Sequence, residues 1–252
     1  MNSKLHKVFV PVTINNIIAF LILLFLLMQL HQLLHHVIGG VLCGKVAYLT
    51  FDRHHFSADI SDSAYKIATI LAPLFSHCLA IWIGLFLLIK NRYSLLGFSL
   101  IFASMPVARL AAINGGDERF YGLWICQSAG FDLSYATIIG LLIMLLIIVP
   151  PVVTGFLFIA NKRRWLLFLS FLILPVAFYS IFILYPDHKY IVPQVVDSFE
   201  TGKASSLALR LFWGLPLIDI IVTLVLSALF FGKYFRYLVL NCNKQDKTHM
   251  NS

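Results

Sequence analysis

The sequence predicts an all-α fold, a polytopic membrane helix bundle of about six transmembrane helices forming one integral membrane domain over residues 1–252. Composition is the first reason, because 60% of the residues are hydrophobic and 12% are charged, whereas soluble domains are about 25% charged. The second is that the chain divides into long apolar segments, each able to supply the ~20 residues that a bilayer crossing needs. These features exclude a soluble globular enzyme, a disordered chain and a coiled coil.

The predicted spans are nearly uncharged segments bounded by polar or basic residues. They cover residues 12–38, 65–89, 93–113, 133–160, 165–185 and 208–231. The first is expected to be an uncleaved signal anchor, because its apolar stretch runs on into His31 without a small-residue cleavage site. Gly39-Gly40 is expected to end that helix. Pro150-Pro151 predicts a kink or break in the fourth span.

Two connections and the C-terminal segment have recognisable patterns. Residues 45–58 are rich in β-branched and aromatic side chains and predict a short β-hairpin. Residues 114–132 begin with Asn-Gly-Gly, which indicates a turn, and contain a compact cluster of acidic and basic residues. The sequence KYFRYLVL after Gly232 is interpreted as the frayed end of span six, with an amphipathic segment on the inner membrane face as the alternative.

Loop charges predict the orientation. The N-terminal tail, the 90–92 and 161–164 loops and the C-terminal tail share one side, and against Asp246 alone they carry Lys4, Lys7, Lys90, Arg92, Lys162, Arg163, Arg164, Lys233, Arg236, Lys244 and Lys247. Both termini are therefore expected in the cytoplasm. The net charge of +8 arises from the basic residues of the loops on one side of the membrane. The expected partner is therefore the lipid bilayer, and no nucleic acid is expected to bind. Short loops and compact size favour a bacterial inner membrane.

Ionisable groups inside spans are costly and mark functional sites. Those of this chain are His31, His35 and His36 with Gln29 and Gln32 in the first span, His77 in the second, Arg109 in the third and Asp219 in the sixth. A cation such as Arg109 requires an anionic partner inside a membrane protein. Three acids are candidates for this partner, namely Asp117, Glu118 and Asp219.

His31 and His35 are four residues apart, so both imidazoles lie on one helix face, as two ligands of a single zinc ion do. Interhelical hydrogen bonding by these histidines is the alternative interpretation. Two carboxylates qualify as a third ligand, namely Asp117 just beyond span three and Asp219 within span six. His36 lies on the adjacent stripe of the helix. His77 is more typical of an interhelical hydrogen bond than of a metal ligand.

Three segments resemble the site-2 protease family of intramembrane zinc metalloproteases. Residues 31–35 read His-Gln-Leu-Leu-His where the family has His-Glu-x-x-His, residues 70–74 read Ile-Leu-Ala-Pro-Leu against the family's Ala-Gly-Pro-Leu, and residues 114–117 read Asn-Gly-Gly-Asp near the position of the family's aspartate ligand. The similarity covers roughly residues 20–120. It implies a zinc ion held by His31, His35 and either Asp117 or Asp219, and a transmembrane or juxtamembrane peptide as substrate.

Gln32 departs from that pattern, because it replaces the glutamate that takes a proton from the zinc-bound water. An amide cannot do this, although Gln32 can position a water or a ligand. Glu118 is the candidate for a substitute base. The chain is therefore expected to be a metalloprotease-like membrane protein that binds metal with impaired or absent peptidase activity. The alternative is a small transporter, channel or accessory protein that uses the buried His, Arg and Asp groups to bind an ion or a partner helix.

Overall fold

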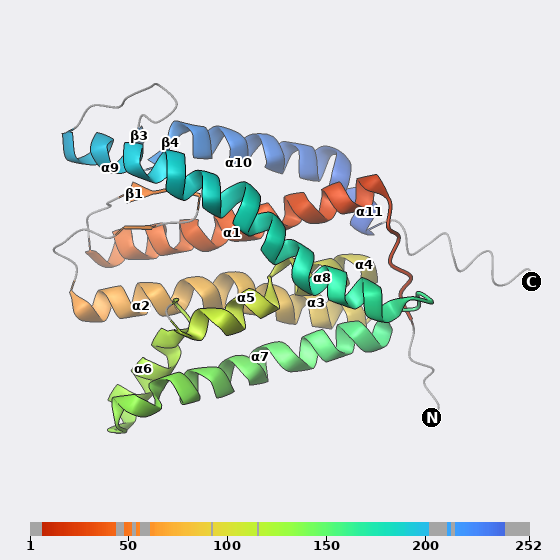
Figure 1. The fold of residues 1–252 in the computed structure, drawn as a ribbon, viewed down its shortest axis with the longest axis horizontal. Helices are drawn as coiled ribbons and strands as arrows, with labels where there is room; N and C mark the ends of the chain where they lie inside the picture. Colours follow the sequence, from red (N-terminus) through yellow and green to blue (C-terminus); the bar gives the residue numbers. More distant parts are fainter. Residues whose placement is uncertain are drawn as a thin grey trace, which may run out of the picture.

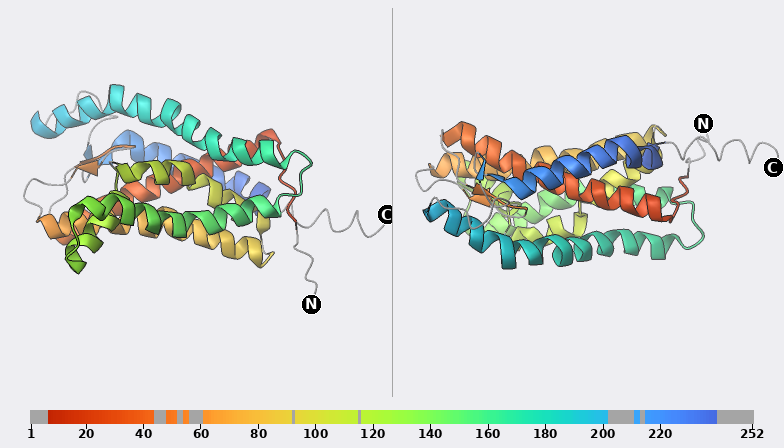
Figure 2. Two further views of the ribbon diagram at one scale, coloured as in Figure 1. Left: turned by 60° about the horizontal axis from the view of Figure 1, so that its bottom comes forward. Right: turned by 90° about the horizontal axis from the view of Figure 1, so that it is seen from above.

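The structure, a computed structural model, describes residues 7–43, 48–51, 54–55, 61–91, 93–114, 116–201, 211–212 and 215–239. Within them, six helical segments are long and apolar enough to cross a membrane, namely Ile14–Leu42, Ser63–Ile89, Ser94–Asn114, Leu133–Phe158, Arg164–Asp197 and Leu217–Val239. The long helices lie alongside one another as a bundle (Figures 1 and 2). The predicted all-α membrane fold is thus confirmed.

The chain forms its elements in the following order. The first half contains α1 (Ile14–Cys43), β1 (Tyr48–Leu49), β2 (His54–His55), α2 (Asp62–Pro73), the π-helix η1 (Leu74–Cys78), α3 (Leu79–Ile89), α4 (Ser94–Ala103), α5 (Pro106–Ala111), the 3-10 turn η2 (Ala112–Asn114) and α6 (Arg119–Ala129). The second half contains η3 (Leu133–Tyr135), α7 (Ala136–Phe158), α8 (Arg164–Tyr179), the π-helices η4 (Ser180–Leu184) and η5 (Asp187–Ile191), α9 (Val192–Thr201), β3 (Leu211–Phe212), β4 (Leu215–Pro216), α10 (Leu217–Leu229), η7 (Phe230–Tyr234) and α11 (Phe235–Val239).

The predicted hairpin in residues 45–58 is confirmed, since β1 and β2 pair antiparallel with Tyr48 opposite His55. The segment after Gly232 continues the last span through η7 and α11 up to Val239, as the frayed-end interpretation predicts. The predicted start of span six at residue 208 lies outside the described residues. The helix described there begins at Leu217, directly after Pro216.

Two helix ends and the course of the fourth span at its two prolines differ from expectation. The prediction that Gly39-Gly40 ends the first helix is wrong, because α1 continues to Cys43; inside a bilayer, helical hydrogen bonding outweighs the helix-breaking tendency of glycine. Helix α7 passes through Pro150 and Pro151 without a break. The fifth span extends to Asp197, because the π-helical segments η4 and η5 continue the helix past Pro186.

The third span is interrupted between α4 and α5. Met105 adopts a left-handed conformation with φ of 49°, and Pro106 begins the next helix. Proline has no N–H to donate and restricts the residue before it, so it begins helices more readily than it continues them. After the interruption, α5 and η2 lead the chain towards residue 117.

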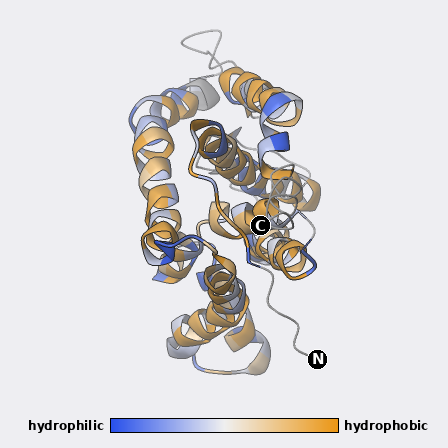
Figure 3. Ribbon diagram, turned by 90° about the vertical axis from the view of Figure 1, so that its right-hand side faces the viewer, coloured by the Kyte–Doolittle hydropathy of each residue, from blue (hydrophilic) through white to orange (hydrophobic). Residues whose placement is uncertain are grey.

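Both described ends of the chain lie at the same end of the bundle (Figure 1). The backbone N–H of Val8 donates to Phe158 O (2.7 Å), and that of Ala160 donates to Val8 O (2.9 Å). The Asn16 side chain donates to Tyr237 O (3.0 Å), which joins the start of α1 to α11. In the view onto this end, polar residues gather where the chain turns, and the helix surfaces are mostly hydrophobic (Figure 3).

Helix α1 is the central element and packs on α2, α4, α8, α10 and α11. Its most apolar stretch is 61% buried, whereas that of the last span is 11% buried. Elsewhere, large apolar side chains such as Leu146 (73% exposed) and Phe231 (69% exposed) face outward, so the bundle contacts lipid. Helices α3 and α4 touch through backbone at Gly84 and Gly97, where an added Cβ would lie 2.6 Å from the other glycine's carbonyl oxygen.

Candidate metal centre

Helix α1 carries the two imidazoles of the predicted pair. His31 and His35 are both buried, and their ring centroids are 4.7 Å apart at an interplanar angle of 81°. The four-residue spacing places them one helical turn apart on the same face. Since α1 is surrounded by other helices, this face is directed into the protein, and both rings are withdrawn from lipid.

Asp117 meets this pair from the segment that follows η2. Its Oδ2 lies 3.2 Å from Nε2 of His31 and 2.9 Å from Nε2 of His35. Two ligands bound ~2.05 Å from a tetrahedral zinc ion are about 3.3 Å apart, so these distances suit one ion. Among the described residues, His31, His35 and Asp117 form the one group of three His, Cys, Asp or Glu side chains whose ligand atoms lie within 4.8 Å of one another.

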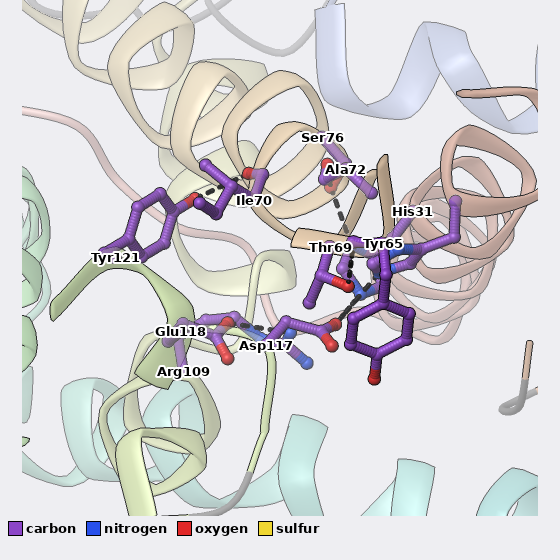
Figure 4. Close-up of polar contacts among 11 residues, drawn as sticks. His31, Tyr65, Thr69, Ile70, Ala72, Ser76, Arg109, Asp117, Glu118 and Tyr121 are labelled. Atoms are coloured by element: carbon purple, nitrogen blue, oxygen red, sulfur yellow. Dashed lines mark hydrogen bonds and ion pairs between the residues drawn. The ribbon is translucent and has the colours of Figure 1, made fainter. Parts of the chain in front are cut away.

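The chain around Asp117 is tied to the second span by neighbouring contacts (Figure 4). Tyr121 of α6 donates its hydroxyl to Ile70 O of α2 (3.1 Å), and Phe120 packs edge-on against Tyr65 with ring centroids 5.6 Å apart. Both contacts bring the start of α6 onto α2. The carboxylate of Asp117 is therefore presented to α1 by α2 and α6 together.

Ser76 determines which nitrogen of His31 carries a proton. Its hydroxyl donates to Ala72 O (2.6 Å) and so must accept from Nδ1 of His31, 3.1 Å away. A neutral imidazole protonated at Nδ1 has its lone pair on Nε2, and Nε2 faces the Asp117 carboxylate. Two lone pairs directed at each other require a cation between them, which is either a proton or a metal ion. Metal-bound histidines commonly have an outer hydrogen bond of this kind.

Arg109 pairs with Glu118, which settles the choice among its three candidate partners. Its Nη1 lies 3.0 Å from Glu118 Oε1, and the Glu118 side chain is fully buried (Figure 4). Burial raises the pKa of Glu118 against the lowering effect of Arg109. Burial also favours a raised pKa for Asp117, but the contacts of its carboxylate with the ring nitrogens of His31 and His35 outweigh it and hold the pKa of Asp117 well below its usual value. Asp117 is therefore the more readily ionised of the two neighbouring acids.

Two further histidines, His36 and His77, and Gln32 lie near the cluster with different surroundings. Gln32 and His36 on α1 are both buried. His77 is fully buried in η1, its ring centroid lies 4.8 Å from that of His31, and among the described residues neither of its ring nitrogens has a hydrogen-bond partner. An unpaired buried imidazole is costly and commonly indicates a ligand or water that it contacts. π-Helical turns such as η1 are also frequent at functional sites.

Asp219 is not part of this cluster. It lies in the first turn of α10, 3% exposed, and neither carboxylate oxygen has a hydrogen-bond partner among the described residues. Asp187 of η5 is the acid whose negative charge acts on Asp219. Asp187 is itself fully buried and accepts a hydrogen bond from Thr50 (2.7 Å). Of the two alternatives for a third ligand, the structure brings Asp117 to the histidines and leaves Asp219 elsewhere.

Two polar residues of functional interest were not singled out from the sequence. Ser76 belongs to no recognisable motif. The available signals were its position next to His77 and its four-residue spacing from Ala72, whose carbonyl accepts its hydroxyl hydrogen. Asp187 lies in Pro-Asp-His-Lys, which has the composition of a loop, but the structure makes it a buried helical residue. The long apolar stretch that ends at Pro186 was the available signal.

No family model matches this sequence, no curated protein matches it, and no solved structure matches it. The resemblance to the site-2 protease family therefore depends on the motif residues alone.

Proposed function

We propose that this integral membrane protein binds one zinc ion through Nε2 of His31, Nε2 of His35 and the carboxylate of Asp117. The observation that supports the proposal is the approach of one Asp117 oxygen to both Nε2 atoms, at 3.2 and 2.9 Å. Two imidazoles and a carboxylate are a ligand set that suits zinc. Ser76 adds to this, because it holds His31 in the tautomer that a metal ligand needs.

The proposed centre has three protein ligands, and zinc with three such ligands polarises a water or a carbonyl in its fourth position. Gln32 stands where the peptidases of the resembled family have their base, and its amide takes up no proton. Glu118 is engaged by Arg109 through Oε1. The proposed protein is thus a metalloprotease-like scaffold that binds metal and a transmembrane peptide or partner helix, with peptide hydrolysis impaired or absent.

Metal content tests the proposal directly. Elemental analysis of the purified, detergent-solubilised protein should find about one zinc per chain, and far less in His31→Ala/His35→Ala and in Asp117→Ala. His36→Ala is the matched control, because this buried histidine of α1 lies outside the cluster and its loss should leave zinc in place. Wild-type protein without stoichiometric zinc would overturn the proposal.

Hydrolysis needs a separate test. If the scaffold lacks only its base, Gln32→Glu should begin to cleave a membrane-anchored reporter peptide that wild type leaves intact. Cleavage by the wild type that disappears in Glu118→Gln, with unchanged zinc content, would instead identify Glu118 as the substitute base.

A transport function is the second candidate, and Asp219 is the observation that favours it. A carboxylate that is 3% exposed within a span, with a second buried acid nearby and no hydrogen-bond partner in the part of the chain that the structure describes, is typical of proton and ion pathways. Proteoliposomes containing wild type would then show proton-coupled flux, and Asp219→Asn would abolish it. Equal leak from empty liposomes, wild type and Asp219→Asn would exclude this function.

We also propose that the end of the bundle holding Val8, the 159–163 connection and α11 faces the cytoplasm of a bacterial inner membrane. The excess of Lys and Arg in the connections at that end supports this orientation. Cysteine labelling with a membrane-impermeant reagent tests it: Lys162→Cys should be protected in intact cells and Ser134→Cys should be labelled. The reverse pattern would invert the topology.

A further inference from the structure

A second candidate site lies at the opposite end of α1 from the histidines. Here a cavity of about 390 Å³ opens between α1, α4, α8 and α11, with the segment before α1 and the connection after α7 at its edge. Its volume is within the range of small-molecule pockets, ~300–1,000 Å³. Phe20 in its wall is eleven residues from His31, or about 16 Å along the helix axis. The cavity is therefore separate from the metal centre.

The interior of the cavity is apolar. Ile17 and Phe20 of α1, Leu95 of α4, and Phe171 and Leu174 of α8 contribute to its walls. The serines in the walls do not change this, because their hydroxyls are bonded to their own helices. Ser99 donates to Leu95 O (2.8 Å), and Ser170 donates to Leu166 O (2.8 Å). An occupant would thus meet hydrocarbon along most of its length.

One edge of the cavity is basic. Lys162 and Arg163 line it directly before α8, and both are exposed. Among the described residues, neither forms an ion pair, and no acidic residue lines the cavity. The amide of Asn161 is engaged by the backbone of Val10, because it accepts from Val10 N (2.9 Å) and donates to Val10 O (3.0 Å). The two cations are thus the charged groups that can meet an occupant.

We propose that this cavity binds an anionic phospholipid of the leaflet at the basic end of the bundle. Its phosphate pairs with Lys162 and Arg163, and one acyl chain occupies the apolar cavity between α1 and α8. Charge complementarity selects the occupant: a purely apolar ligand would leave the two cations unused, and a free phosphate would leave the cavity unfilled. Basic pockets between transmembrane helices recognise anionic headgroups in this manner, and arginine forms strong charge-assisted hydrogen bonds with phosphate.

The test measures lipid binding to the detergent-solubilised full chain by native mass spectrometry, with phosphatidylglycerol and phosphatidylcholine of equal chain length as probes. Wild type should prefer phosphatidylglycerol by on the order of tenfold. Lys162→Ala/Arg163→Ala should bring the two lipids within about twofold of each other. Lys233→Ala/Arg236→Ala is the matched control, since it removes two cations from the same end that do not line the cavity, and it should keep the preference.

A second variant tests the acyl chain. Ser170→Trp places a large apolar ring in the cavity and keeps both cations, so it should weaken binding of phosphatidylglycerol at least as much as the double variant does. Undiminished binding by a folded Ser170→Trp protein would place the lipid outside the cavity and overturn the proposal. Equal affinity of wild type for the two lipids, an equal loss in the control pair, or full competition by inorganic phosphate would also overturn it. Circular dichroism of each variant verifies that the helices are formed.

Discussion

The hydroxyl of Ser76 lies 3.1 Å from Nδ1 of His31 and donates its own hydrogen to Ala72 O. This places the proton of a neutral His31 on Nδ1 and leaves Nε2 to face Asp117. Ser76 of the second span thus holds His31 of the first span in the tautomer whose Nε2 can bind a cation.

Ser76→Ala should lower the zinc affinity by ~10–100-fold, because His31 then loses the partner that holds its tautomer and ring orientation. Competition with a chelator of known affinity measures the change. Ser99→Ala is the matched control, as Ser99 is a buried serine that also bonds the carbonyl four residues back but contacts no histidine. An equal affinity of Ser76→Ala and wild type would show that the hydrogen bond plays no part in metal binding.

Zinc affinity should fall as the pH is lowered. Each of the three ligands must be unprotonated to bind zinc, so protons compete with the metal. The pKa of Asp117 is held well below its usual value, so its carboxylate remains available as a ligand until the solution is strongly acidic. Affinity must therefore rise with pH and fall on acidification. Zinc content after dialysis at a series of pH values measures this, and an affinity that does not depend on pH would contradict it.

Removing Arg109 should destabilise the protein, because Glu118 would be left buried and unpaired. Arg109→Met is expected to cost about 3–5 kcal/mol in free energy of unfolding, measured by titration of the folded protein with SDS. Arg109→Met/Glu118→Gln should cost less than the sum of the single changes, since neither charge is then stranded. Additive effects would mean that the ion pair is not coupled.

His77→Leu should keep the zinc stoichiometry near one and change the surroundings of the metal. The ring of His77 lies beside that of His31 and has no hydrogen-bond partner within the described ranges, so we expect it to contact whatever occupies the fourth position. The visible absorption of the Co²⁺-substituted protein reports this, and it should shift in His77→Leu but not in His36→Ala. Identical spectra of wild type and His77→Leu would assign His77 a packing role.

The sequence by itself determined the membrane bundle, and it placed His31 and His35 on one helix face. Both follow from local rules, because hydropathy over ~20 residues marks a span and a four-residue spacing aligns two side chains. The local rule failed at Gly39-Gly40, where the sequence predicted the end of the first helix. Glycine ends helices in soluble proteins because water can satisfy the freed backbone groups, and the bilayer core holds no such water.

Only the tertiary structure decided between Asp117 and Asp219, and between three acids as the partner of Arg109. Each of these choices depends on how α2, α6 and α10 pack around α1, and no local pattern encodes the distance between side chains far apart in the chain. Ser76 could not be identified from the sequence for the same reason. Its neighbouring residues do not indicate that its hydroxyl contacts His31, which lies on another helix. Spans and helix faces are local properties of the chain, whereas the candidate metal-binding cluster forms only where three segments converge.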